Sequence, residues 1–241
     1  MYPRVVAVAV ALAGGCKDDP RRGVAHAEPV DHEATEAAPL APPCDGCTLD
    51  IPASDREIPL LVVMHGDRET ASIAADRWRE VTKARGWALL SLQCPVSEGC
   101  KDSWWQWSGD PGWVTRQVET VLGEAPIDRS RVFLIGWSGG GSYIGMYAQH
   151  WDSTFAAVVI HGGGQAPIKD DCPTRPLPAY FLVGDQNPAH GAAKQLRAYL
   201  EGCGEEVIWD LVEGADHRHE DAALDHNKGD VILDWLERRP R

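Results

Sequence analysis

The chain has 241 residues, which is long enough for one domain with a sizeable hydrophobic core. Hydrophobic residues make up 44% and charged residues 24%, as is usual for a soluble globular protein. The formal net charge of -13 argues against a nucleic-acid partner, because phosphate binding requires a basic surface. Neither the charge nor the composition predicts the oligomeric state.

The N-terminal residues 1–16 have the pattern of a signal peptide. Arg4 supplies a positive charge, and the apolar run Val5–Ala13 that follows is too short to cross a bilayer. Small residues before Cys16 resemble the lipobox of bacterial lipoproteins, although Ala13 stands where leucine is usual. We therefore expect an exported protein anchored by a lipid on Cys16, in the periplasm or on the cell surface. An ordinary cleaved signal peptide is the alternative.

Residues 17–43 are expected to form a disordered tether. They are rich in alanine, proline and acidic residues and have no apolar periodicity, so they cannot bury enough surface to offset the entropy of ordering the chain. We expect the folded domain to comprise residues 44–241, and no membrane contact other than the lipid anchor.

Six cysteines lie in the predicted domain, and an exported protein can oxidise them to disulfides. Closeness in sequence favours a bond between Cys94 and Cys100, which leaves Cys172 with Cys203. The segment Cys44–Cys47 could form its own disulfide, act as a redox dithiol or contribute to a zinc site. A zinc site requires a second ligand pair at suitable spacing, and none stands out, so we expect structural disulfides and no metal.

Short apolar runs alternate with longer amphipathic stretches through the predicted domain. Nearly continuous apolar runs are typical of strands that are covered on both faces, and strands alternating with helices indicate a parallel sheet. The sequence therefore predicts an α/β fold, with a mostly parallel central sheet and helices on both faces. The strands are expected at 58–64, 87–92, 132–135, 155–160, 179–183 and 207–211, and the helices at about 71–85, 112–122, 139–149, 189–200 and 220–237.

The strongest functional motif is Gly136-Trp137-Ser138-Gly139-Gly140, which lies directly between a predicted strand and a predicted helix. This is the Gly-x-Ser-x-Gly nucleophile elbow in the context that it requires. The tight turn needs glycines and exposes the hydroxyl of Ser138, which we predict to be a nucleophile. The backbone N–H of Gly139, at the start of the helix, is the expected donor to an oxyanion.

Residues 58–238 resemble the α/β-hydrolases, and specifically the secreted esterases related to polyhydroxybutyrate depolymerases and feruloyl esterases. The segments Ile127–Gly141 and Phe155–Val159 carry this resemblance. It implies an α/β-hydrolase fold and a serine esterase that works through an acyl-enzyme without a cofactor. The expected partner is a small-molecule or polymeric ester substrate, and the natural ester does not follow from the resemblance.

A second oxyanion donor is expected upstream, where the pair His65-Gly66 ends the first core strand. In similar hydrolases the residue after this pair donates its N–H, and here that residue is Asp67. A carboxylate beside a developing negative charge is unfavourable, so the side chain of Asp67 is expected to point away. The alternative is a plain strand-to-loop turn.

The general base is predicted to be His217, because a serine hydroxyl is a weak nucleophile without one. Chain order in this fold is serine, acid and then histidine, and His217 follows the last predicted strand in a turn that resembles the Gly-x-x-His turn of the family. His219 lies two residues further on and is the alternative.

The acid of the triad is expected directly after the strand at 179–183. Relatives commonly carry an aspartate at the position that Asn187 occupies here, and Asp185 is the carboxylate within reach. We expect Asp185 to orient the imidazole, with Asn187 as a neutral acceptor in the alternative case. A neutral partner stabilises an imidazolium less and predicts a slower enzyme.

Tryptophans are concentrated in the segment Lys101–Trp113, in a loop at the predicted active-site edge of the sheet. Aromatic faces in such a loop suit flat or polymeric substrates, so Trp104 and Trp105, together with Trp137 of the elbow, are candidate substrate contacts. The alternative is that these rings only cap the core.

Two further interpretations of function remain beside a serine esterase. A peptidase or other acyl hydrolase would use the same machinery on another substrate. A catalytically degenerate hydrolase that only binds its ligand belongs to a different class, and the departure at Asn187 keeps it open.

Overall fold

The computed structural model of the chain describes residues 40–105, 109–169 and 171–241. The predicted signal peptide, Cys16 and nearly all of the predicted tether lie outside the described residues. No helix in the described ranges is both long and apolar enough to cross a bilayer.

Seven strands of the described residues form one sheet in the order β1-β3-β2-β4-β5-β6-β7. Only β1 is antiparallel to its neighbour, so the predicted mostly parallel sheet is confirmed. The edge strand β1 was not predicted, because it has three residues and no continuous apolar run. The strands are β1 (Thr48–Asp50), β2 (Ile58–Met64), β3 (Ala88–Leu92), β4 (Ile127–Trp137), β5 (Ala157–His161), β6 (Ala179–Gly184) and β7 (Val207–Val212).

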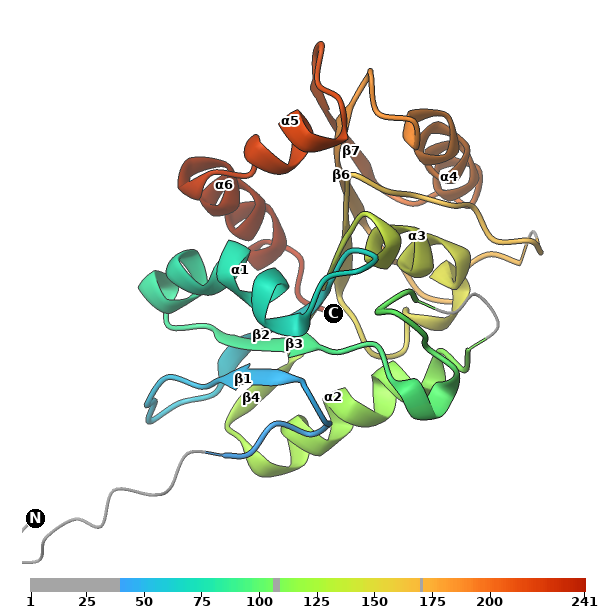
Figure 1. The fold of residues 1–241 in the computed structure, drawn as a ribbon. Helices are drawn as coiled ribbons and strands as arrows, with labels where there is room; N and C mark the ends of the chain where they lie inside the picture. The colour runs from blue at the N-terminus through green and yellow to red at the C-terminus, as the bar shows by residue number, and fades with distance from the viewer. Residues whose placement is uncertain (1–39, 106–108, 170) are drawn as a thin grey trace, which may run out of the picture. The chain divides into compact units, whose positions relative to one another are not determined.

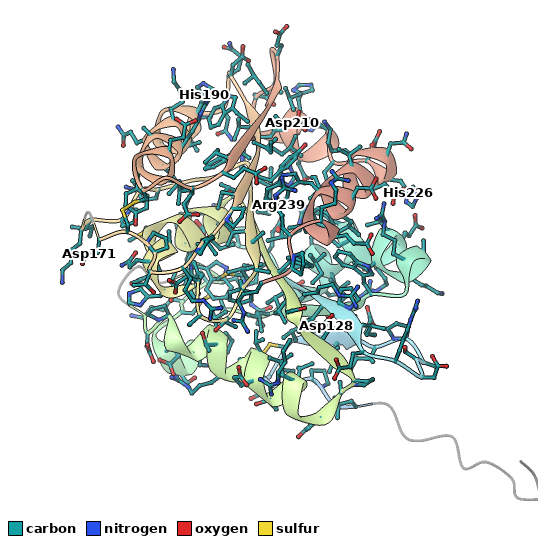
Figure 2. The ribbon with its side chains drawn as sticks, turned by 180° about the vertical axis from the view of Figure 1, so that it is seen from behind. Asp128, Asp171, His190, Asp210, His226 and Arg239 are labelled. Carbon is teal, nitrogen blue, oxygen red and sulfur yellow. A yellow bond between two sulfur atoms is a disulfide. The ribbon has the colours of Figure 1, made fainter. Side chains whose placement is uncertain are left out.

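Helices cover both faces of this sheet, as predicted (Figure 1). On one face lie α1 and α6, and on the other α2, α3 and α4. His190 on α4 and His226 on α6 mark the two sides (Figure 2). The helices are α1 (Ala71–Arg85), α2 (Gly112–Glu124), α3 (Gly139–Met146), α4 (His190–Gly202), α5 (His217–Ala222) and α6 (His226–Glu237), with short 3-10 turns at Val96–Glu98 and Ala148–His150.

The central strand β2 shows why both faces are covered. Its side chains alternate between two buried clusters: Leu60, Val62 and Met64 pack with α2, α3 and α4, whereas Leu61 and Val63 pack with α1 and α6. Because every residue of β2 is buried, the strand has the nearly continuous apolar sequence from which it was predicted.

The predicted helix at 220–237 is wrong in its extent, because the structure divides this segment into α5 and α6. Helix α5 ends at Ala222, and Asp225 begins α6, since its carboxylate accepts a hydrogen bond from the N–H of Lys228 at 2.8 Å. Helix α5 also begins earlier than predicted, at His217, where Asp216 caps its N–H groups. The separate helix α5 therefore carries both His217 and Glu220 to the sheet edge.

The described residues contain three disulfide bonds, which join Cys44 to Cys47, Cys94 to Cys100 and Cys172 to Cys203. The pairing of Cys94 with Cys100 that closeness in sequence favoured, and the pairing of Cys172 with Cys203 that it left, are thus present, and the segment Cys44–Cys47 forms its own disulfide. The first two disulfides join near neighbours in the chain, while the third ties the loop after β5 to the end of α4.

Candidate active site

The turn between β4 and α3 holds Ser138 in a strained conformation, with φ 50° and ψ -112°. Glycine is required on both sides of it. A Cβ atom on Gly136 would lie 2.4 Å from the carbonyl carbon of Gly140, and one on Gly140 would lie 2.6 Å from the carbonyl oxygen of Met64. The backbone N–H of Ser138 donates to the carbonyl of His161 at 2.8 Å, which ties the turn to β5. Ser138 therefore lies at the carboxyl edge of the sheet, as predicted.

His217 reaches the serine from the first turn of α5. Its Nε2 lies 2.9 Å from Oγ of Ser138. The ring of Trp137 stacks on the imidazole with a centroid distance of 4.5 Å and an angle of 5° between the planes, which holds the orientation of the imidazole. His219, the alternative base, is exposed and contacts Asp216 at 2.8 Å. The structure thus brings His217, and not His219, to the predicted nucleophile.

Asp185 does not contact His217, contrary to the sequence-based expectation. Its carboxylate is exposed and accepts a hydrogen bond from the N–H of Gly214 at 2.7 Å. The chain turns directly after β6, where the N–H of Gln186 donates to the carbonyl of Ala215 at 3.0 Å. This turn directs Asp185 outward and Asn187, two residues later, inward.

Asn187 is buried beside the imidazole and uses both ends of its amide. Its Oδ1 accepts the N–H of Ala189 at 2.8 Å, and its Nδ2 donates to the carbonyl of Gly162 at 3.1 Å. The same Nδ2 lies 3.0 Å from Nδ1 of His217 and also donates to the carboxylate of Glu220. The amide presents its nitrogen to the histidine, and not the acceptor oxygen that was considered as the alternative.

Glu220 is a carboxylate of this site that the sequence analysis missed. It is fully buried, its Oε1 accepts the N–H of Gly184 at 2.6 Å, and its Oε2 lies 3.6 Å from Nδ1 of His217. Its signal is the spacing His-x-x-Glu, which places both residues on one side of a helical turn. An acidic residue in a predicted amphipathic helix is ordinary, however, so nothing marked this one as buried.

His161 supports the same corner from β5. Burial lowers the pKa of His161 to about 4, so the ring is neutral near pH 7. Its Nε2 lies 3.1 Å from the backbone carbonyl of Glu220 and donates to it. The helix turn that carries Glu220 is thereby tied to the sheet.

The side chain of Asp67 lies at the start of α3, and the expectation that it points away is wrong. A Cβ atom built on Gly139 would lie 2.1 Å from Oδ1 of Asp67, so the carboxylate occupies the space beside this glycine. The same Oδ1 accepts a hydrogen bond from the N–H of Trp105 at 3.4 Å. The positive end of α3 attracts a carboxylate. Burial also raises the pKa of Asp67 above its usual range.

An open pocket of about 230 Å³ lies in front of the serine. Small and polar side chains dominate its walls. The lining residues are Asp67, Ser138, Gly139, Ser142, Gly162, Asn187, Pro188, Ala189 and His217.

The three predicted tryptophan contacts do not line this pocket. Trp105 is buried and donates its indole N–H to the carbonyl of His65 at 3.0 Å, so it packs in the core. Trp137 is buried behind the imidazole. Trp104 is 42% exposed, and the guanidinium of Arg68 lies 5.2 Å from the centre of its ring. The alternative interpretation, in which the rings complete the core, describes Trp105 and Trp137.

Among the residues that the structure describes, no three histidine, cysteine, aspartate or glutamate side chains gather as a metal site. The acidic and imidazole groups of the candidate site instead contact one another, the nucleophile and backbone N–H groups.

Comparison with known proteins finds no matching family model and no matching curated protein. Solved structures do match. A thermostable esterase superposes with a TM-score of 0.63 and 21% identity, over 81% of this chain and 59% of that chain. A carboxylesterase from Bacillus cereus superposes with a TM-score of 0.57 and 16% identity, over 80% and 93% of the two chains. A truncated carbohydrate esterase from gut microbiota has a TM-score of 0.63 and 14% identity, over 80% and 90%.

This chain spans less than two thirds of the length of the thermostable esterase, and all three identities are low. The likeness therefore establishes the architecture and not the substrate. Together with the sheet order and the strand–serine–helix turn, it identifies the fold of this chain as the α/β-hydrolase fold.

Proposed function

We propose that the chain is a serine hydrolase that cleaves carboxylic esters through an acyl-enzyme intermediate. The observation that carries the proposal is the 2.9 Å contact between Oγ of Ser138 and Nε2 of His217 at a strained strand-to-helix turn. A nucleophile and a base within hydrogen-bonding distance are the minimum requirement for this chemistry. The likeness to solved esterases supports the same reaction class.

In the proposed reaction, Oγ of Ser138 forms a bond to the acyl carbon while His217 accepts the hydroxyl proton. His217 then returns this proton to the alcohol oxygen as the ester bond breaks. Water attacks the acyl-enzyme next, again giving its proton to His217, and the carboxylic acid leaves as Ser138 regains its proton. The backbone N–H groups of Gly139 and Asp67 are the proposed donors to the oxyanion of each tetrahedral intermediate.

The pocket favours substrates with a short acyl group. Its volume of about 230 Å³ is below the range of about 300–1,000 Å³ that is common for sites that enclose a drug-sized ligand. The small lining residues Gly162 and Ala189, with Pro188, are the proposed wall beside the acyl group, and the open side of the pocket is the proposed place of a larger alcohol or a polymer chain.

A fluorophosphonate probe and p-nitrophenyl acetate test the proposal directly. We expect the folded, oxidised chain to react with both, and Ser138→Ala to lose both reactions. Ser142→Ala is the matched control, because Ser142 lines the same pocket and its hydroxyl accepts the N–H of Gly164 at 3.1 Å instead of contacting His217. A well-folded parent that reacts with neither reagent would refute the hydrolase.

A non-catalytic ligand-binding protein on the same scaffold is the second candidate. The amide nitrogen of Asn187 beside His217 favours it, because a triad normally presents a carboxylate there. Turnover by the parent that depends on Ser138 excludes this candidate. Comparison of ester with peptide substrates then distinguishes an esterase from a peptidase.

We also propose that the chain is exported and is anchored to a membrane by a lipid on Cys16. The three disulfides support an oxidising compartment. Expression of the full chain in a bacterium with radiolabelled palmitate is expected to label the parent and not Cys16→Ser. Labelling that survives this substitution would contradict the anchor.

A further inference from the structure

Three groups that can accept a hydrogen bond surround Nδ2 of Asn187, which has only two hydrogens. They are the carbonyl of Gly162, the carboxylate of Glu220 and Nδ1 of His217. Asn187 and Glu220 are buried, so water does not readily supply missing hydrogen bonds. The state of His217 therefore depends on how this amide is oriented.

The surroundings allow only one orientation of the amide of Asn187. Rotating it by 180° would place its oxygen against the carbonyl of Gly162 and the carboxylate of Glu220. Its NH2 group would then face the N–H of Ala189, which now donates to Oδ1 at 2.8 Å. The reversed amide would thus exchange three hydrogen bonds for three like-polarity contacts and gain only one acceptor contact, with Nδ1 of His217, which is unfavourable for buried groups.

The fixed amide determines the tautomer of the resting imidazole. Both hydrogens of this NH2 group are donated to Gly162 and Glu220, and its nitrogen lies 3.0 Å from Nδ1 of His217. A hydrogen on Nδ1 would therefore face a donor group that offers no acceptor, so a neutral ring is better satisfied with Nδ1 unprotonated. The proton of the ring then lies on Nε2, which faces Ser138 at 2.9 Å. A protonated Nε2 cannot accept the proton of the serine, so this tautomer is inactive.

The protonated imidazole has a different requirement, because Nδ1 must then donate. Among the described residues, Glu220 has the one carboxylate within 4.0 Å of a ring nitrogen of His217. The N–H donors at both of its oxygens, from Gly184 and Asn187, stabilise a negative charge on Glu220. Glu220 is therefore placed to balance the positive charge that His217 acquires during the reaction.

We propose that Glu220 is a positioning residue that supplies the negative charge of this active site, while Asn187 holds the resting His217 in its inactive tautomer. In an ordinary triad, one carboxylate provides both the negative charge and the direct contact with Nδ1. Here Glu220 provides the charge and Asn187 makes the contact. This inference rests on the proposed hydrolase function. It predicts that the enzyme turns over slowly. Exchanging the amide of Asn187 and the carboxylate of Glu220 between the two positions is expected to accelerate turnover.

The decisive variant is the double exchange Asn187→Asp with Glu220→Gln. It leaves the net charge unchanged and puts a carboxylate oxygen beside Nδ1, while the hydrogen bond to the carbonyl of Gly162 is lost. The new glutamine can accept from Gly184 and donate to the new aspartate. We expect kcat for p-nitrophenyl acetate to rise at least about ten-fold with little change in KM, because the imidazole now rests with Nε2 free to accept. Glu220→Gln alone should lower kcat, because its NH2 group would face that of Asn187.

A second measurement reports the tautomer without requiring turnover. In 15N-histidine-labelled protein, the 15N chemical shifts distinguish the protonated from the bare ring nitrogen. The signals of His217 are assigned by their loss in His217→Ala. We expect the proton on Nε2 in the parent and on Nδ1 in the double exchange.

A parent that already carries the proton on Nδ1 would overturn the inference, and so would a folded double exchange whose kcat does not exceed that of the parent. Thermal melting establishes that each variant is folded. Because the tautomer is read without substrate, the inference can fail while the parent still hydrolyses esters. Loss of probe labelling and turnover in the parent would instead refute the hydrolase itself.

Discussion

The two sides of His217 are built in different ways. On the Nε2 side, the proposed nucleophile Ser138 belongs to five consecutive residues, Gly136–Gly140, whose backbone is packed too closely for any side chain at the outer glycines. On the Nδ1 side, Asn187 comes from the loop after β6, Gly162 follows β5, and Glu220 comes from α5.

This difference determines how each side tolerates substitution. A turn whose conformation depends on its own glycines keeps its geometry only while those glycines are present, and a substitution at one of them disrupts the whole turn. A corner assembled from three elements can keep its shape while the charge moves from one residue to its neighbour. Asn187 and Glu220 show the second case, because a carboxylate remains buried near Nδ1 although the usual position carries an amide.

The largest expected effect comes from removing the residue that both sides share. His217→Ala should lower kcat/KM by about 10³-fold or more, because no other described imidazole lies beside Ser138. His219→Ala is the control and should change kcat/KM less than about two-fold, since His219 is exposed and contacts Asp216. Steady-state kinetics with p-nitrophenyl acetate measure both. Equal losses in the two variants would contradict the assignment of the base.

The next largest effect tests how rigid the nucleophile turn is. Gly136→Ala should destabilise the fold by about 3 kcal/mol, because the new Cβ meets backbone atoms of Gly140 and Gly141 that cannot rotate away. Gly123→Ala is the matched control at an exposed position of α2 with no atom within 4 Å of the new Cβ. It should stabilise the protein by about 0.5–1 kcal/mol. Urea unfolding of both variants measures the difference, and a neutral Gly136→Ala would show that the turn can relax.

The contrast between these regions also explains what could be predicted from the sequence. An apolar run predicted β2, an amphipathic stretch predicted α1 and the spacing of glycines predicted the turn at Ser138, because those features depend on neighbours in the chain. His217 was predicted from chain order. The partner of its Nδ1 could not be predicted, because which of Asp185, Asn187 and Glu220 faces inward depends on the turn after β6 and the start of α5.

The orientation of Asp67 was mispredicted for a related reason. The argument from charge repulsion considered only a developing oxyanion and left out the positive end of α3, which is present in the resting protein. A side chain can therefore occupy a place that suits the free enzyme and opposes the reaction.

Asp67→Asn provides a smaller, pH-dependent test. Burial raises the pKa of Asp67, so the group stays protonated to a higher pH than an exposed aspartate and becomes negative as the pH rises further. Only the negative form repels the oxyanion. The ratio of kcat/KM, variant over parent, should thus be close to one at low pH and rise to about ten-fold at about pH 8. A ratio that is independent of pH, or below one at high pH, would contradict this role.

The smallest expected effect is that of Asp185→Ala, and it distinguishes the observed corner from an ordinary triad. If Asp185 oriented His217, its removal would lower kcat by several orders of magnitude. The structure instead shows an exposed carboxylate on the N–H of Gly214, so we expect kcat within about two-fold of the parent and a loss of stability of at most about 1 kcal/mol. Kinetics and thermal melting of the same preparation measure both quantities. A large loss of kcat in a stable Asp185→Ala variant would mean that the loop after β6 rearranges when substrate binds, which would return the acid to Asp185 and leave Glu220 with a structural role.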